Sequence, residues 1–74
     1  MDQVHSLDKF TSPFGGQEIE LLSVDHEAGF TSFRLRIREG KRFTIFDLDK
    51  QSAARWGRTM VEWADAQPDL TEMK

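Results

Sequence analysis

Cysteine is absent from the 74 residues, and histidine occurs only twice. Without thiols the chain cannot form a disulfide framework, a thiolate zinc site or a cysteine nucleophile. Any metal site would have to use His5, His26 and acidic side chains, but the two histidines do not have the close spacing that zinc sites use. We therefore expect no metal site, no cofactor, and a reduced, cytoplasmic setting.

Long apolar runs are also missing. No stretch approaches the roughly 20 residues that a membrane-spanning helix needs, and the first ten residues lack the basic-then-apolar pattern of a signal peptide. A chain of 74 residues forms one domain and buries only about 60% of its unfolded surface. We expect a soluble protein without membrane attachment and with little room for an enclosed pocket.

The clearest pattern present is the alternation of apolar and basic residues within 30–48. Alternation with a period of two predicts strands, and Gly40 between two such runs predicts a β-hairpin. The apolar residues stay at odd-numbered positions on both sides of the turn. This favours a three-residue turn, Arg38 to Gly40, with Gly40 in the left-handed conformation. This register gives one apolar face and one arginine face, from the pairs Ile37 with Lys41, Leu35 with Phe43, and Phe33 with Ile45.

A further strand is predicted at 17–24, before the hairpin. A five-residue loop would place Glu20 opposite Arg34 and Glu18 opposite Arg36. The positions of the apolar residues and the opposite charges of the paired side chains both favour this register. We therefore predict a three-stranded antiparallel β-meander.

A helix is expected from about Lys50 to Ala66. Asp49 is a good N-cap residue, and Pro68 marks the end of the helix. Gly57 suggests a close approach of the helix to a strand or to an aromatic ring. An apolar stripe at helical spacing should pack on one face of the sheet; it consists of Ala53, Trp56, Gly57, Met60 and Ala64, with Val61 and Trp63 at its margins.

The chain is thus predicted to be an α+β protein, with the meander and one C-terminal helix at 17–67, an N-terminal arm at 1–16 and a frayed tail at 68–74. The second sheet face carries an apolar patch, which includes Leu22, Val24 and Phe46. We expect the arm to cover this patch through Phe10 or Phe14. The alternative is that a second protomer covers it.

Residues 43–49, with the sequence FTIFDLD, resemble the first motif of haloacid dehalogenase-like phosphatases. In that family the first aspartate is the nucleophile and the second is an acid/base, which would be Asp47 and Asp49 here. The chain departs from the motif at Lys50 and Gln51, and it is too short for the parallel sheet of that family. We interpret both aspartates as residues of the helix start.

Two groups of side chains are candidates for binding. Arg38, Lys41 and Arg42, with Phe46 near the same surface, offer cations and one ring for a polyanion or single-stranded nucleic acid. Trp63 lies at the margin of the apolar stripe of the helix, where it is expected to be partly exposed. A partly exposed indole is a good anchor for a protein interface.

The absence of a catalytic constellation, together with surplus apolar surface, indicates a small interaction or accessory protein that is not an enzyme. Its expected partner is another protein or a second copy of the chain. The alternative function is a polyanion or nucleic-acid binding module that uses the arginine-rich hairpin.

Overall fold

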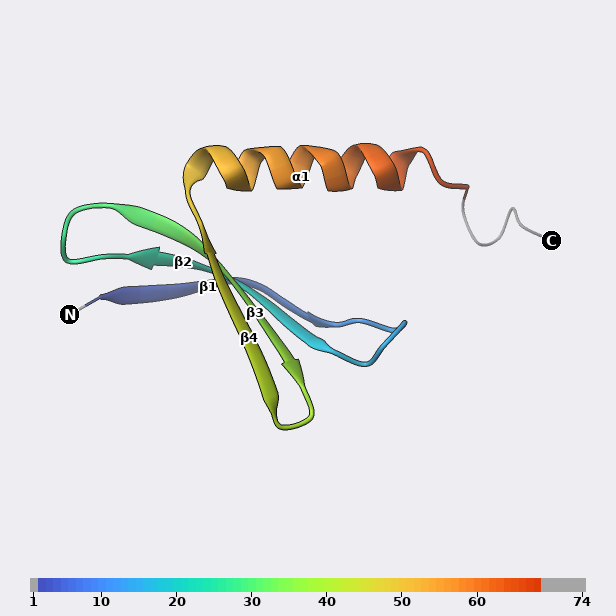
Figure 1. The fold of residues 1–74 in the computed structure, drawn as a ribbon, viewed down its shortest axis with the longest axis horizontal. Helices are drawn as coiled ribbons and strands as arrows, with labels where there is room; N and C mark the ends of the chain where they lie inside the picture. The colour runs from blue at the N-terminus through green and yellow to red at the C-terminus, as the bar shows by residue number, and fades with distance from the viewer. Residues whose placement is uncertain (1, 69–74) are drawn as a thin grey trace.

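The computed structural model describes residues 2–68, which form one antiparallel sheet followed by one helix (Figure 1). The elements are β1 (Gln3–Thr11), β2 (Glu18–Asp25), β3 (Thr31–Glu39), β4 (Arg42–Leu48) and α1 (Lys50–Asp65). Each strand pairs with the next one along the chain, so the order in the sheet is β1-β2-β3-β4. The α+β class and the meander are confirmed, but the sheet has four strands rather than three. Most of the predicted tail, 69–74, lies outside the described residues.

The fourth strand is β1, within the segment predicted to be an arm. Its pairing with β2 shifts register between Ser6 and Asp8, so Leu7 is the extra residue of a β-bulge. A bulge breaks the two-residue alternation of a strand. With this shift, Val4 pairs with Val24 and Phe10 with Ile19, which lie on opposite faces of the sheet, so the apolar residues of β1 do not show the alternation that marks a strand in the sequence.

The arm does not cover the apolar patch. Phe14 is fully exposed in the turn after β1, and Phe10 is about half exposed. Leu22 and Val24 are nevertheless buried, Val24 with only 1% of its surface exposed. Val24 lies between its paired neighbours Val4 on β1 and Ser32 on β3, so strand pairing provides much of its cover.

The β2–β3 pairing keeps the predicted faces but is displaced by two residues. Glu20 lies opposite Arg36 and Glu18 opposite Arg38, instead of Arg34 and Arg36. The loop includes Phe30, whose carbonyl oxygen accepts a hydrogen bond of 2.9 Å from the His26 backbone N–H. The Phe30 ring also stacks on the His26 ring with a centroid distance of 4.3 Å, so Phe30 belongs to the loop rather than to the strand.

The predicted three-residue turn of the β3–β4 hairpin is wrong. Glu39 pairs with Arg42, which leaves only Gly40 and Lys41 in the loop. Gly40 has a φ of 60°, as predicted, whereas Lys41 does not have a positive φ. Glycine at the first of two turn positions is typical of a type II′ turn, which matches the twist of the flanking strands. The shorter turn exchanges the two faces of β4.

We call the side of the sheet with Arg34, Arg36 and Arg38 the arginine face, and the opposite side the apolar face. Because of the shorter turn, Phe43 and Ile45 lie on the arginine face, opposite Arg38 and Arg36. The apolar face carries Ile19 and Leu21 from β2, Phe33, Leu35 and Ile37 from β3, and Phe46 and Leu48 from β4. The placement of Phe46 beside the arginines is therefore a wrong prediction.

The start of α1 agrees with the sequence analysis. The Asp49 carboxylate accepts hydrogen bonds from the backbone N–H groups of Gln51 and Ser52, at 3.2 and 3.3 Å. The hydrogen bonds from Ser52 hold the pKa of Asp49 below its ordinary value. Only Asp49 separates β4 from α1, so this cap sets the direction in which the helix leaves the sheet.

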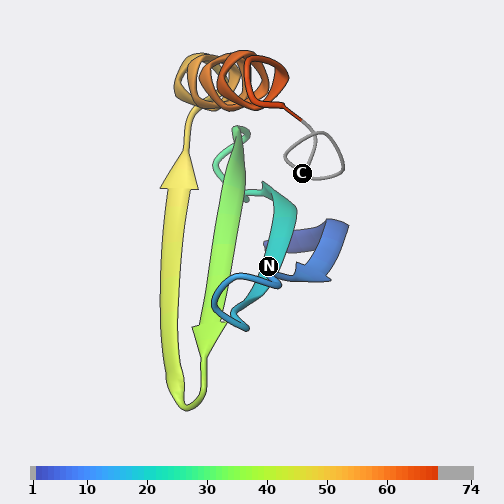
Figure 2. The ribbon, with the colours of Figure 1, turned by 90° about the vertical axis from the view of Figure 1, so that its right-hand side faces the viewer.

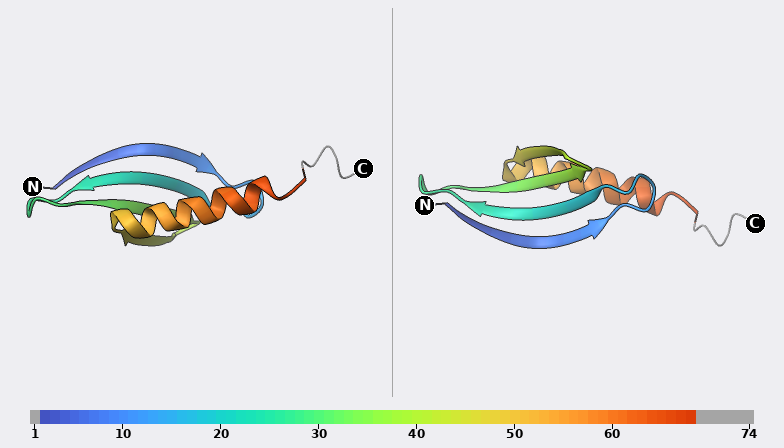
Figure 3. Two further views of the ribbon diagram at one scale, coloured as in Figure 1. Left: turned by 90° about the horizontal axis from the view of Figure 1, so that it is seen from above. Right: turned by 90° about the horizontal axis from the view of Figure 1, so that it is seen from below.

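The packing of α1 differs from the expectation. The helix contacts β3 and β4 but not β1 or β2, and it contains no buried residue. Figures 2 and 3 show that α1 crosses the open end of the β3–β4 hairpin, opposite the turn, and extends away from the hairpin. A Cβ atom at Gly57 would meet nothing within 4 Å, so the predicted close approach is absent. The buried hydrophobic side chains among residues 2–68 are Leu22, Val24 and Leu48.

Candidate binding surface

The three arginines of β3 are all paired with acidic side chains. Arg34 donates two hydrogen bonds to Asp47, at 2.8 and 3.0 Å. Arg38 donates to Glu18 at 2.9 Å and to the Gly40 carbonyl oxygen at 3.1 Å. Arg36 lies 3.5 Å from Glu20, and its guanidinium sits over the Phe43 ring at 4.9 Å from the centroid. The arginine face therefore neutralises much of its own charge.

Asp47 has a defined role in this arrangement. Its hydrogen bonds with Arg34 hold the pKa of the Asp47 carboxyl below its usual value and raise the pKa of Arg34. Asp47 is thus an ionised partner of Arg34 at neutral pH. The side chain of Asp49 is engaged in the helix cap, so the two aspartates of the FTIFDLD segment have separate structural roles.

The structure does not bring the five predicted binding residues together. Arg38, Lys41 and Arg42 lie at or beside the hairpin turn. Phe46 lies on the apolar face, where its ring stacks on the Trp56 ring with a centroid distance of 5.5 Å. Trp63 lies on α1, two turns beyond Trp56, and 67% of its surface is exposed. Phe46 therefore packs against α1, and Trp63 is part of α1, so neither lies beside the cations of the hairpin turn.

Large apolar side chains of α1 are exposed along one stripe. We call the residues Ala53, Trp56, Gly57, Met60, Trp63 and Ala64 the helix stripe. Trp56 is 42% exposed and Met60 is 58% exposed, so the expectation that this stripe is covered by the sheet is wrong. The stacking of Trp56 on Phe46 shows that the stripe begins on the side of the apolar face.

The apolar face is also incompletely covered. Its residues on β2 and β3 are half-buried rather than buried. Since α1 does not contact β2, no helix lies over Ile19 and Leu21. We define the uncovered surface as the helix stripe together with the apolar face. An apolar surface shared by two elements is typical of protein interaction sites.

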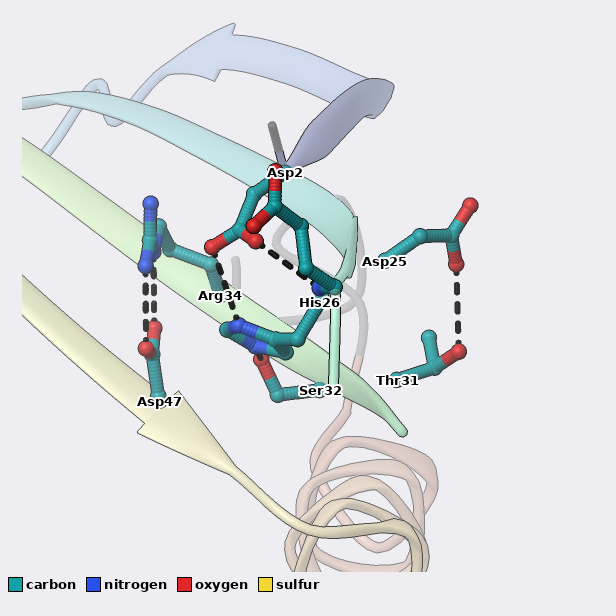
Figure 4. Close-up of polar contacts among 8 residues, drawn as sticks. Asp2, Asp25, His26, Thr31, Ser32, Arg34 and Asp47 are labelled. Carbon is teal, nitrogen blue, oxygen red and sulfur yellow. Dashed lines mark hydrogen bonds and ion pairs between the residues drawn. The ribbon is translucent and has the colours of Figure 1, made fainter. Parts of the chain in front are cut away.

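A polar cluster joins the start of β1 to the β2–β3 loop (Figure 4). His26 Nε2 lies 2.8 Å from the Ser32 hydroxyl, and His26 Nδ1 lies 3.2 Å from the Asp2 carboxylate. Asp2 also accepts a hydrogen bond of 3.0 Å from the Glu27 backbone N–H. This order of side chains was not anticipated from the sequence, because Asp2 and Ser32 are brought together only by the pairing of β1, β2 and β3.

Serine, histidine and aspartate in this order can form a nucleophile and its base. Here each member has a structural task as well, since the cluster fastens the loop through Glu27, and His26 stacks on Phe30. The hollow along Glu18, Arg36 and Phe43 and the hollow along α1 are formed by other residues. We therefore assign the cluster to the stability of the loop.

No group of three or more histidine, aspartate or glutamate side chains within residues 2–68 is placed to hold a metal ion. In the same part of the chain, no helix is long and apolar enough to cross a membrane.

The fold and its surface define a class of small α+β protein, with a four-stranded meander and an amphipathic helix that the sheet leaves uncovered. Within that class, the chain belongs to the family described as "Family of unknown function (DUF6967)", whose model matches residues 1–66. No curated protein and no solved structure matches the chain.

Proposed function

We propose that this chain is a small, non-catalytic interaction or accessory protein that binds another protein surface through the uncovered surface. The observation that carries the proposal is the state of α1, which has an apolar stripe but no buried residue. In a globular protein most helix stability comes from packing of such a stripe. A helix that lacks this packing within its own chain obtains it from a partner. A cytoplasmic setting remains part of the proposal.

The side chains of the helix stripe suit a binding site. Trp63, Met60 and Trp56 combine a large apolar area with exposure, and tryptophan and methionine are enriched at interfaces. The stripe contains no charged residue, so its partner should also be apolar at the contact.

A photo-crosslinking amino acid at position 63 tests the proposal in extracts of the source cell. We expect the full chain with this substitution to crosslink to protein, whether to another chain or to a second copy. The matched control carries the same amino acid at position 58, because Arg58 is exposed on the opposite side of the helix. Equal or absent crosslinking at the two positions would contradict the proposal.

Polyanion binding by the hairpin is the second candidate, and its remaining support is local. No ion pair involves Lys41 or Arg42 within the described residues, whereas Arg38 is paired with Glu18. Two cations beside one turn make a weak, salt-sensitive site.

Titration with a single-stranded oligonucleotide, followed by NMR, distinguishes this candidate. We expect no saturable shift of the amides of 34–38, because their arginines are already paired. Small shifts near Lys41 and Arg42 should disappear as salt is added. Saturable shifts across 34–42 at physiological ionic strength would favour polyanion binding instead.

A further inference from the structure

We infer that the uncovered surface binds the same surface of a second copy of this chain, forming a two-fold symmetric dimer with the two α1 helices antiparallel. The inference rests on the proposed function and names the partner of that same surface. Three features of the described residues support it: the incomplete cover of both the helix and the apolar face within one chain, the spacing of the apolar residues along the helix, and the distribution of helix charges.

Within one chain, the sheet covers only part of the helix stripe, and the helix covers only part of the apolar face. The helix does not contact its own β2, and the one-residue connection and the Asp49 cap restrain its direction. A two-fold axis would place the helix stripe and apolar face of one copy against the same surface of the other. A different protein would have to supply both a sheet-covering element and a helix-covering element.

The apolar residues of the helix stripe have a spacing that two antiparallel copies can match. Ala53, Trp56, Met60 and Trp63 follow the 3-4-3 spacing of a coiled-coil seam. With the helices antiparallel and centred near Arg58, Trp63 of one copy meets Ala53 of the other, and Trp56 meets Met60.

Gly57 lies beside this seam with no neighbour in its own chain. Glycine is unfavourable inside a helix, so its presence is explained if another backbone approaches there.

The charges of α1 favour the antiparallel orientation. The first half of the helix carries Lys50, Arg55 and Arg58, and the second half carries Glu62 and Asp65. Antiparallel helices bring opposite charges and opposite helix-dipole ends together, whereas parallel helices bring like charges together. The helix stripe does not include Arg55, Arg58, Glu62 or Asp65. These charges therefore favour one orientation of the two helices but do not form the apolar contact between them.

Sedimentation equilibrium of the purified full chain, up to about 200 µM, tests the inference. We expect a dimer, and we expect Met60→Glu to weaken it by about 100-fold or more, because two unpaired carboxylates would enter an apolar contact. Met60 is exposed in the single chain, so the fold of the variant should survive, which circular dichroism checks. The matched control Ala54→Glu adds the same charge at an exposed position outside the stripe and should leave the dimer unchanged.

Cysteine crosslinking tests the relative orientation of the two α1 helices. Because the chain has no native cysteine, only the introduced cysteines can react. A short bis-maleimide should join Ala53→Cys chains to Ala64→Cys chains in a mixture, and should join neither variant to itself. Self-crosslinking of each variant would indicate parallel helices and overturn the antiparallel dimer.

A purified chain that stays monomeric throughout the concentration range overturns the inference. If position 63 still crosslinks to another protein in extracts, the proposed function stands without the dimer. If it crosslinks to nothing, both fail.

Discussion

Val24→Ala should lower the free energy of unfolding by about 2–3 kcal/mol. Val24 has the lowest exposure of the buried residues, 1%, and it lies on the inner strand β2 between Val4 and Ser32. The substitution removes two methyl groups and leaves a cavity that paired strands cannot easily close. A domain of this size has only about 3–5 kcal/mol of stability, so urea denaturation should show a partly unfolded population in buffer.

Val61→Ala is the matched control for this prediction. The same two methyl groups are removed, but Val61 is 59% exposed on α1, and alanine is the better helix former. We expect a change within about 0.5 kcal/mol. Equal losses for the two variants would mean that the described sheet is not the stable centre of the protein.

Gly40→Ala should also destabilise the protein, by about 1–3 kcal/mol. Gly40 has a φ of 60° at the first position of a two-residue turn, a conformation that a residue with a Cβ adopts only with strain. Because this turn fixes which residues of β4 face the helix, the amide shifts of Phe46 and Leu48 should change as well. Thermal unfolding and NMR measure the two effects.

Lys41→Ala is the control, because Lys41 occupies the other turn position without a positive φ. Its stability should stay within about 0.5 kcal/mol of the wild type. An unchanged stability in Gly40→Ala would contradict the positive φ of Gly40, which both the two-residue turn and the longer loop predicted from the sequence require.

The parts of the fold that depend on local chemistry could be predicted from the sequence. Asp49 caps a helix because its carboxylate reaches the next backbone N–H groups, whatever the remainder of the chain does. The strands β2, β3 and β4 follow from alternation, and glutamates do face arginines across β2 and β3.

The exact register could not be predicted, because displacements by two residues preserve every face. Glu18 finds an arginine in either register, so charge sign does not separate them. At the hairpin, unbroken alternation pointed to an odd loop, but turn geometry selected a loop of two residues. β1 was missed because the bulge at Leu7 breaks its alternation.

The candidate site was only partly predictable for a different reason. Trp63 was correctly expected to be exposed, whereas Trp56 and Met60 were expected to be covered. An amphipathic pattern shows that one side of a helix avoids water, but it does not say whether the cover comes from the same chain. The short connection through Asp49 decides this point, and its effect on helix direction is visible only in three dimensions (Figure 1).

The order of strands in the sheet has a consequence for synthesis. Since each strand pairs with its neighbour in the chain, the sheet can grow one hairpin at a time as residues 2–48 leave the ribosome. The helix, which completes the uncovered surface, is translated after the sheet. All strands of the sheet are therefore synthesised before the proposed binding surface is complete, so the order of translation limits association through that surface between neighbouring ribosomes.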